Sequence, residues 1–83
     1  MFNSRRTRQK PSRPKVTNRI KVLRTERGLT QEALAEAVGV TRVTINCIER
    51  AAYLPSLELA LGLARLFGRP VEDVFIVEEE PNA

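Results

Sequence analysis

The sequence predicts an all-α fold, a bundle of five short helices followed by a short C-terminal β-strand. Apolar residues recur at helical spacing in several segments after residue 16. Threonine, serine and glycine stand at positions where these helical segments would begin and end. A chain of 83 residues is also too short for more than one domain. Because so small a core gives marginal stability, we expect association with a partner or a second copy to matter.

Residues 1–16 are predicted to form a disordered basic arm. Two prolines and very few apolar residues leave this segment little to bury. It carries six cations and no acidic residue: Arg5, Arg6, Arg8, Lys10, Arg13 and Lys15. Such an arm beside a nearly neutral folded part favours a polyanionic partner. The alternative is a solubilising tail, or residues added by a misassigned start.

The first helix is expected between Thr17 and Arg27. Thr17 has the side chain of an N-cap, and Gly28 is the expected left-handed stop. Ile20 and Leu23 lie on one apolar stripe, which we expect to face the core.

The second and third helices are expected to follow a short connection. Thr30 and Thr41 are the predicted N-caps, and Gly39 is predicted to end the second helix. Val40 is expected to be buried in the turn between them. The predicted inward-facing residues are Leu34, Ala35 and Val38 in the second helix and Ile45 and Ile48 in the third.

Two further helices and a strand complete the predicted fold. Ser56 is predicted to cap the fourth helix, and Pro70 is expected at the first position of a short fifth helix. The strand is expected at residues 75–77, which are β-prone. The folded domain would then span residues 17–77, with an acidic tail at 78–83. The apolar stripe of the fourth helix consists of Leu59, Leu63, Leu66 and Phe67.

The segment from residue 30 to residue 49 is the most informative for function. It contains two helices joined by a turn of about four residues around a glycine. Ala35 is small enough for the next helix to cross closely, and Gly39 supplies a positive φ without steric cost. The outer face of that next helix carries Arg42, Val43, Asn46 and Cys47. A helix presented in this way can enter the major groove of DNA with its N-terminus first.

This pattern resembles the phage-repressor-like (Xre/Cro-type) helix-turn-helix regulators. The resemblance covers about residues 18–80, implies a five-helix phage-repressor-like bundle, and implies operator DNA as the partner, usually of a dimer. The matching segments are NRIK at 18–21, LTQEALA at 29–35, TRVTI at 41–45, PSLELA at 55–60 and VEDVF at 71–75.

One segment departs from the family's pattern. After Ile48 and Glu49 the family usually has a small polar residue, then glycine, then lysine, whereas this chain has Arg50, Ala51 and Ala52. Loss of the glycine would either extend the recognition helix by a residue or strain the loop. Loss of the lysine removes a phosphate contact, for which Arg50 is a candidate replacement.

The resemblance also implies roles for individual residues. Arg42, Val43 and Cys47 match the positions that face base edges, and Gln31 matches a glutamine that fixes a phosphate. The guanidinium fork of Arg42 can bind O6 and N7 of one guanine, and Val43 can pack on a thymine methyl. The alternatives for Cys47 are a half-buried small hydrophobe and a redox sensor. The residues that flank the base-facing positions, and are expected to contact the DNA backbone or flanking bases, are Thr41, Thr44, Asn46 and Arg50.

The sequence therefore favours a sequence-specific regulator of transcription that binds double-stranded DNA. The alternative is a DNA-binding antitoxin or adaptor subunit that acts through a protein partner. We do not expect an enzyme, a metal or a cofactor, because the chain has no histidine, no metal-ligand cluster and no phosphate-cradling glycine loop. We expect no effector pocket either, because almost no chain remains after the helical bundle.

A homodimer with a contact near the C-terminus is also expected. Phe75, Ile76 and Val77 are apolar residues placed just before three glutamates, and a strand this short needs a partner. The alternative is that Phe75 folds back on the fourth helix while the other two residues fray. The chain has no run of about 20 apolar residues and no secretory signal, so we expect a cytoplasmic protein without membrane contact. The lone Cys47 agrees with a reducing compartment.

Overall fold

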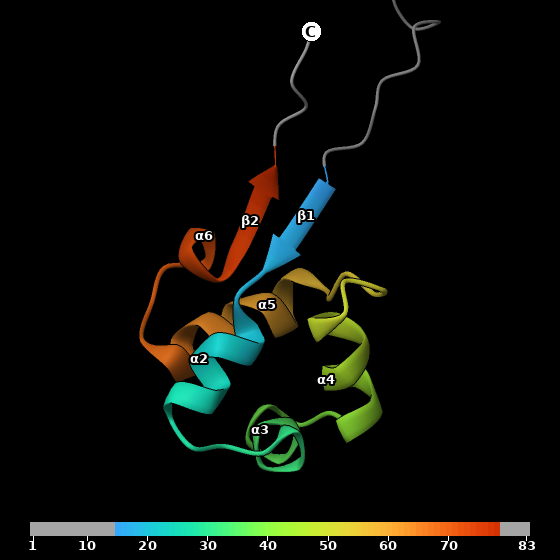
Figure 1. Ribbon diagram of the computed structural model, residues 1–83, viewed down its shortest axis with the longest axis vertical. Coiled ribbons are helices and arrows are strands. Elements are labelled where there is room, and N and C mark those ends of the chain that lie inside the picture. The colour runs from blue at the N-terminus through green and yellow to red at the C-terminus, as the bar shows by residue number, and fades with distance from the viewer. Residues whose placement is uncertain (1–14, 79–83) are drawn as a thin grey trace, which may run out of the picture.

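The computed structural model describes residues 15–78, which form five helices and two strands around one small core (Figure 1). This arrangement confirms the predicted five-helix bundle and adds one strand to it. In chain order the elements are β1 (Lys15–Asn18), α2 (Ile20–Glu26), α3 (Gln31–Val38), α4 (Arg42–Glu49), α5 (Leu57–Phe67), α6 (Val71–Val74) and β2 (Phe75–Glu78).

The core lies where the helices meet, and the predicted apolar stripes supply it. Each of the five helices contributes at least one side chain with essentially no exposed surface. These side chains are Ile20, Leu34, Ile45, Ile48, Leu63 and Val74. Val38, Leu59 and Leu66 are half-buried against this cluster, and so is Val40, which was expected to be fully buried. The first four helices therefore turn their predicted faces inward.

Three predicted N-caps are confirmed. The hydroxyl oxygens of Thr30, Thr41 and Ser56 accept hydrogen bonds from the backbone N–H groups three residues further on, over 3.0, 3.2 and 3.1 Å. Each bond satisfies one of the N–H groups that a helix start leaves without a partner. Pro70 is an N-cap rather than the first helical residue, which moves the start of α6 by one position.

The N-terminal strand corrects the expected start of the folded domain. Thr17, predicted to cap the first helix, lies in β1, and the cap position belongs to Arg19. Lys15 and Val16 also belong to β1 rather than to the arm, and Glu78 belongs to β2 rather than to the tail. The expected disorder of residues 1–14 and the tail at 79–83 lie outside the described residues.

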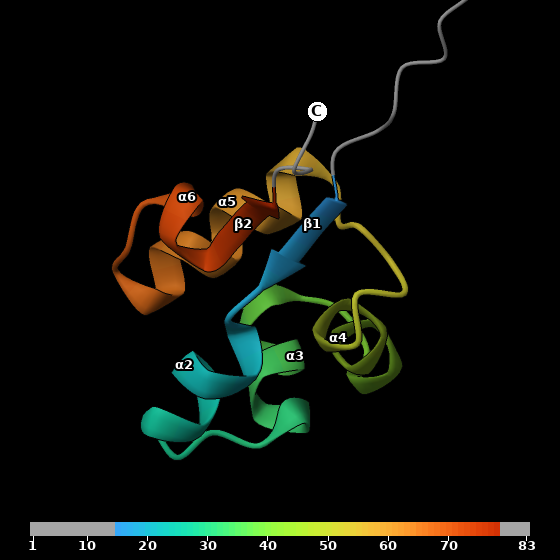
Figure 2. The same ribbon diagram turned by 45° about the horizontal axis from the view of Figure 1, so that its top comes forward.

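The two strands form an antiparallel ribbon that projects from one end of the bundle (Figures 1 and 2). Lys15 pairs with Glu78 at its tip, and Asn18 pairs with Phe75 at its base. The strand predicted at residues 75–77 is therefore present, but its partner is β1 of the same chain. The expected fraying of Ile76 and Val77 is wrong, because both are held in the ladder, although Phe75 does pack on the core. A contact between two copies through residues 75–77 stays a prediction.

No helix within residues 15–78 has both the length and the apolar character needed to cross a bilayer.

Candidate nucleic-acid interface

Helices α3 and α4 form a helix-turn-helix whose turn is tightly specified. Gly39 has a φ of 77°, which places it in the left-handed region, and the N–H of Val40 donates to the carbonyl of Ala35 over 2.9 Å. Thr41 then caps α4. Because Ile45 and Ile48 are fully buried, α4 is fixed to the core along one side and presents the other side outward.

The outer side of α4 carries the residues that the sequence assigned to DNA. Arg42 and Val43 are exposed in its first turn, and 60% of the Val43 surface is accessible. Arg50 is exposed just beyond the end of the helix. Half-buried residues lie between these ends: Thr44, Asn46 and Cys47. All base-facing candidates thus belong to one helix, and its most accessible part is the N-terminal turn.

A chain of hydrogen bonds joins the first turn of α4 to the first residue of α3. The Nη1 of Arg42 donates to the Oε1 of Gln31 over 3.4 Å. The Nε2 of Gln31 in turn donates to Asn46 Oδ1 over 3.3 Å and to Glu49 Oε1 over 3.0 Å. Gln31, predicted to fix a phosphate, therefore also holds together polar side chains at both ends of α4.

A buried ion pair that was not predicted from the sequence lies behind this chain of hydrogen bonds. The Nε and Nη2 of Arg24 donate to the two carboxylate oxygens of Glu49 over 2.6 and 3.2 Å, and Nη1 donates to the carbonyl of Leu29 over 2.9 Å. The two side chains are only 10% and 5% exposed. Paired charges with this many hydrogen bonds tolerate burial, whereas either charge alone would be strongly unfavourable. The pair fixes α4 relative to α2.

The far end of α4 is held by Asn18 at the base of the ribbon. Its Nδ2 donates to the carbonyl of Ile48 over 2.8 Å, and its Oδ1 accepts from the N–H of Ile20 over 3.2 Å. One side chain therefore satisfies a carbonyl at the end of α4 and an N–H at the start of α2.

The departure from the family's pattern after Glu49 strains the loop and does not extend the helix. Helix α4 ends at Glu49, Arg50 is its C-cap, and Ala51 has a φ of 58°. Ala51 is the only non-glycine residue with a positive φ among the described residues. Because this region disfavours a Cβ atom, Ala51 stores backbone strain at the position where the family has glycine.

The structure brings together most of the predicted site and leaves one part outside it. Gln31 is hydrogen-bonded to both Arg42 and Asn46, while residues 75–77 belong to the ribbon.

Arg24 and Glu49 were detectable in principle, since each is a charged residue on an otherwise apolar stripe and their charges are opposite. Within residues 15–78 no three metal-binding side chains gather into one site.

This geometry defines a helix-turn-helix domain, and comparisons with known proteins agree. A family model described as helix-turn-helix matches residues 20–74, most of the chain. The uncharacterised HTH-type transcriptional regulator YgzD of Bacillus subtilis is 51% identical over 63 residues, which are 76% of this chain and 96% of YgzD. The cryptic phage CTXphi transcriptional repressor RstR, from Vibrio cholerae, is 33% identical over 66 residues, 80% of this chain and 59% of RstR.

Two solved structures support the same assignment. A protein from Bacteroides fragilis, described as a putative DNA-binding protein, aligns with a TM-score of 0.65 and 30% identity over 72% of this chain and 97% of its own. The P22 c2 repressor, solved with a synthetic operator, aligns with a TM-score of 0.62 and 30% identity over 64% of this chain and 80% of its own. The chain belongs to the phage-repressor-like helix-turn-helix family and is a DNA-binding regulator.

Proposed function

We propose that this protein regulates transcription by inserting α4 into the major groove of double-stranded DNA and reading a specific sequence there. The observation that carries this proposal is the exposed first turn of a helix that is otherwise fixed to the core. Arg42 and Val43 project from that turn, while Ile45 and Ile48 on the opposite side are fully buried. A recognition helix needs this combination of rigid placement and accessible N-terminal side chains.

The proposed base contacts are made by Arg42, Val43 and Cys47. Arg42 can offer a bidentate fork to guanine, and Val43 can pack on a thymine methyl. The contact between Arg42 and Gln31 is long, at 3.4 Å, so it orients the guanidinium in the free protein and is readily exchanged for a base. Cys47 lies one turn further along the same helix and would meet the neighbouring base pair.

The proposed backbone contacts surround this surface. Gln31 is the first residue of α3, where unpaired N–H groups and the helix dipole favour a phosphate. The hydroxyls of Thr41 and Thr44 lie 3.0 Å apart at the start of α4 and can donate to a second phosphate. Asn46 and Arg50 flank the other end of the recognition surface.

We further propose that two copies act as a two-fold symmetric pair on two half-sites. One bundle offers a small contact surface, whereas a pair places two recognition helices about 34 Å apart on one face of the DNA. The sequence pointed to Phe75–Val77 as the contact because a short strand needs a partner. Since β1 already supplies that partner, the edge of β2 becomes the weaker candidate for the contact between copies.

Selection of bound sequences from random duplex DNA tests this proposal. We expect a preferred site, and Arg42→Ala should weaken binding to it by about 1–3 kcal/mol while relaxing the preference at one base pair per half-site. Arg69→Ala is the charge-matched control, because Arg69 is exposed in the connection between α5 and α6, which lies on the opposite side of the bundle from α4 (Figure 1). Equal weakening by both variants on all sequences would contradict base reading by Arg42.

A further inference from the structure

The outer face of α5 has an unusual composition for a surface helix. Its inward side is buried in the core through Ala60, Leu63, Ala64 and Phe67. The solvent-facing side of an amphipathic helix is normally polar. Here, however, Leu57 is 72% exposed and Leu61 is 48% exposed, and they lie one turn apart on the same face.

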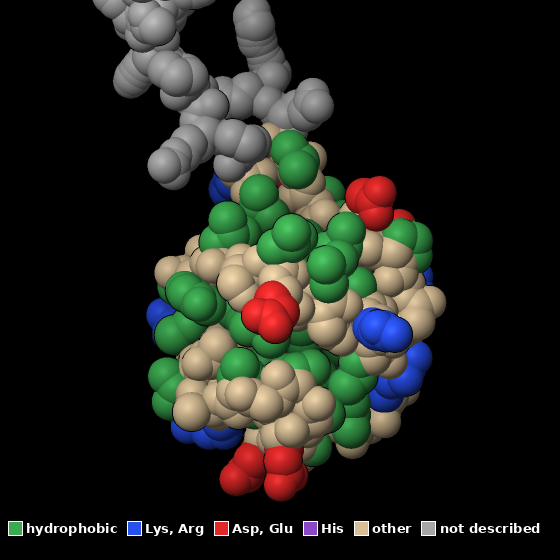
Figure 3. Space-filling view, turned by 180° about the vertical axis from the view of Figure 1, so that it is seen from behind, with side chains coloured by type: hydrophobic (Ala, Val, Ile, Leu, Met, Phe, Trp, Pro, Cys, Tyr) green, Lys and Arg blue, Asp and Glu red, His purple; other side chains and the backbone are tan. Residues whose placement is uncertain are grey.

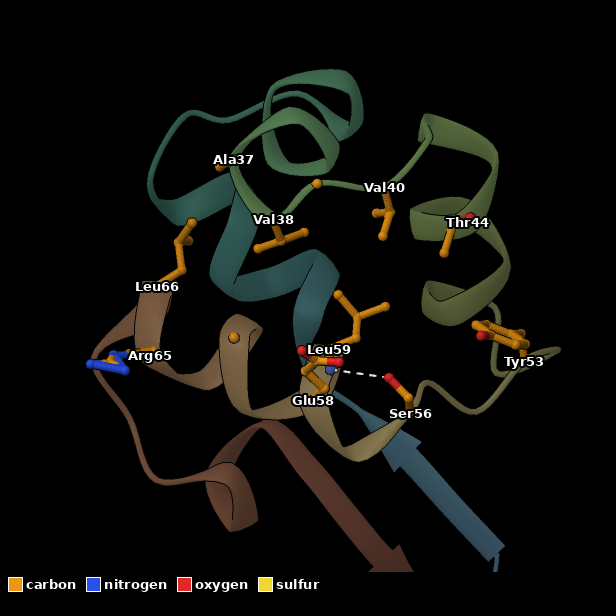
Figure 4. A pocket seen from close by; sticks show the side chains of 12 residues that line it. Ala37, Val38, Val40, Thr44, Tyr53, Ser56, Glu58, Leu59, Arg65 and Leu66 are labelled. Atoms are coloured by element: carbon orange, nitrogen blue, oxygen red, sulfur yellow. Dashed lines mark hydrogen bonds between the residues drawn. The ribbon is translucent and has the colours of Figure 1, made fainter.

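Open grooves run along both sides of this face. One, of about 700 Å³, separates α5 from the turn of the helix-turn-helix, and Val38, Val40 and Leu59 point into it (Figure 4). The other, of about 550 Å³, lies between α5 and the start of α6. Seen from behind the view of Figure 1, hydrophobic side chains gather over the middle of the molecule around one acidic side chain, and other charged side chains lie nearer the margin (Figure 3).

Gly62, which borders both grooves, has no explanation within the chain's own fold. A glycine inside a helix costs about 0.5–1 kcal/mol relative to alanine. Gly62 has no positive φ, and an added Cβ atom would meet nothing within 4 Å. A glycine leaves the helix backbone open at this position, so that a side chain of another molecule can approach it closely.

The charges on the face fit a second copy of the same helix. Glu58 and Arg65 are seven residues apart, about 10.5 Å along the axis, so they do not pair with each other. The only ion pair within residues 15–78 is Arg24–Glu49. If two α5 helices cross antiparallel about a two-fold axis between Leu61 and Gly62, each Glu58 lies opposite the Arg65 of the second copy. The same register places each Leu61 over the Gly62 of the other copy.

We propose that the outer face of α5 is the homodimer contact, with Leu61 entering the groove beside Gly62 of the second copy and two symmetric Glu58–Arg65 pairs flanking it. The contact is isologous, so one patch supplies both the projecting side chain and its recess. This inference takes from the proposed function only the idea that two copies form a two-fold symmetric pair. It concerns the protein free of DNA, and it deepens that function by assigning the surface through which the two copies bind each other.

Sedimentation equilibrium of the full chain with charge-reversal variants tests the contact. Glu58→Lys or Arg65→Glu alone places like charges opposite each other twice, so each should raise the dimer dissociation constant about tenfold or more. The double variant swaps both charges and should restore the dissociation constant to within about threefold of the original. Glu26→Lys and Lys21→Glu, exposed on α2, are the matched controls and should change it little.

Two apolar substitutions test the centre of the contact. Leu61→Ser should dissociate the dimer, while Val22→Ser should not, although both side chains are 48% exposed. Circular dichroism checks that each variant keeps its helical content. Arg42→Ala should leave the dimer intact, which separates this contact from groove reading.

The proposal is overturned by any of three results. The first is a wild-type protein that is monomeric at its highest soluble concentration. The second is a charge-swapped double variant that fails to regain the dimer. The third is a dimer that Val77→Lys on β2 dissociates and the α5 variants leave intact.

Discussion

Glu49→Gln should destabilise the fold far more than its conservative chemistry suggests. The Glu49 carboxylate accepts three hydrogen bonds, two from Arg24 and one from Gln31. A glutamine amide has one oxygen, so at least one of these donors would face an NH2 group. Losing a hydrogen bond to a charged group costs about 1.5–3 kcal/mol, and removing one charge of a buried pair costs about 3–5 kcal/mol. Because glutamine keeps the volume and one acceptor, we expect a loss of about 2–3 kcal/mol.

Urea denaturation followed by far-ultraviolet circular dichroism, at one fixed protein concentration, measures this loss. It is a large fraction of the stability of so small a domain, roughly 5 kcal/mol. Glu26→Gln, on an exposed part of α2, is the control and should change the free energy of unfolding by less than about 0.5 kcal/mol. If Glu49→Gln also stayed within about 0.5 kcal/mol, the ion pair would contribute nothing measurable and the reasoning from its burial would be wrong.

Two further predictions concern the loop after α4 and the basic arm. Ala51→Gly relieves about 1–2 kcal/mol of left-handed strain, but it destabilises the fold by about 0.4–1 kcal/mol because the unfolded chain gains entropy. Urea denaturation should therefore show a free energy of unfolding that is higher by about 0.5–1 kcal/mol. Ala52→Gly, whose φ is not positive, should show no gain, and equal effects of the two would argue against strain at Ala51. Removing residues 1–14 deletes five cations: Arg5, Arg6, Arg8, Lys10 and Arg13. If these contact phosphates, the plot of log affinity against log salt becomes shallower by up to about 4 units, whereas an unchanged slope would show that they do not.

The features that the sequence predicted correctly are local ones. A cap depends on a side chain and an N–H three residues away, so Thr30, Thr41 and Ser56 could be identified without knowing the fold. An inward stripe depends on spacing within one helix, which is why the buried face of α5 was predictable. The resemblance to phage repressors added roles toward DNA for individual residues, such as base-facing positions for Arg42 and Val43.

The features that were missed depend on residues far apart in the chain. Thr17 has the chemistry of a cap and also of a strand, and pairing with Ile76 decides between them. The Arg24–Glu49 pair joins residues 25 positions apart, so the sequence did not show that these two charges meet. The contact of Gln31 with Asn46 and Glu49 likewise exists only once α3 and α4 have met at the angle that Gly39 permits.

The buried pair also separates stability from recognition. Replacing Arg24 with methionine and Glu49 with leucine removes both charges together, and such exchanges often leave stability unchanged or raise it. The same exchange takes away the Glu49 oxygen that holds Gln31, which in turn orients Arg42. We therefore expect the double variant to unfold at least as late in urea as the wild type, yet to discriminate less between its preferred site and a site changed at the base pair read by Arg42. Undiminished discrimination would show that Arg42 finds its base without Gln31, and the chain of hydrogen bonds behind α4 would then serve the fold alone.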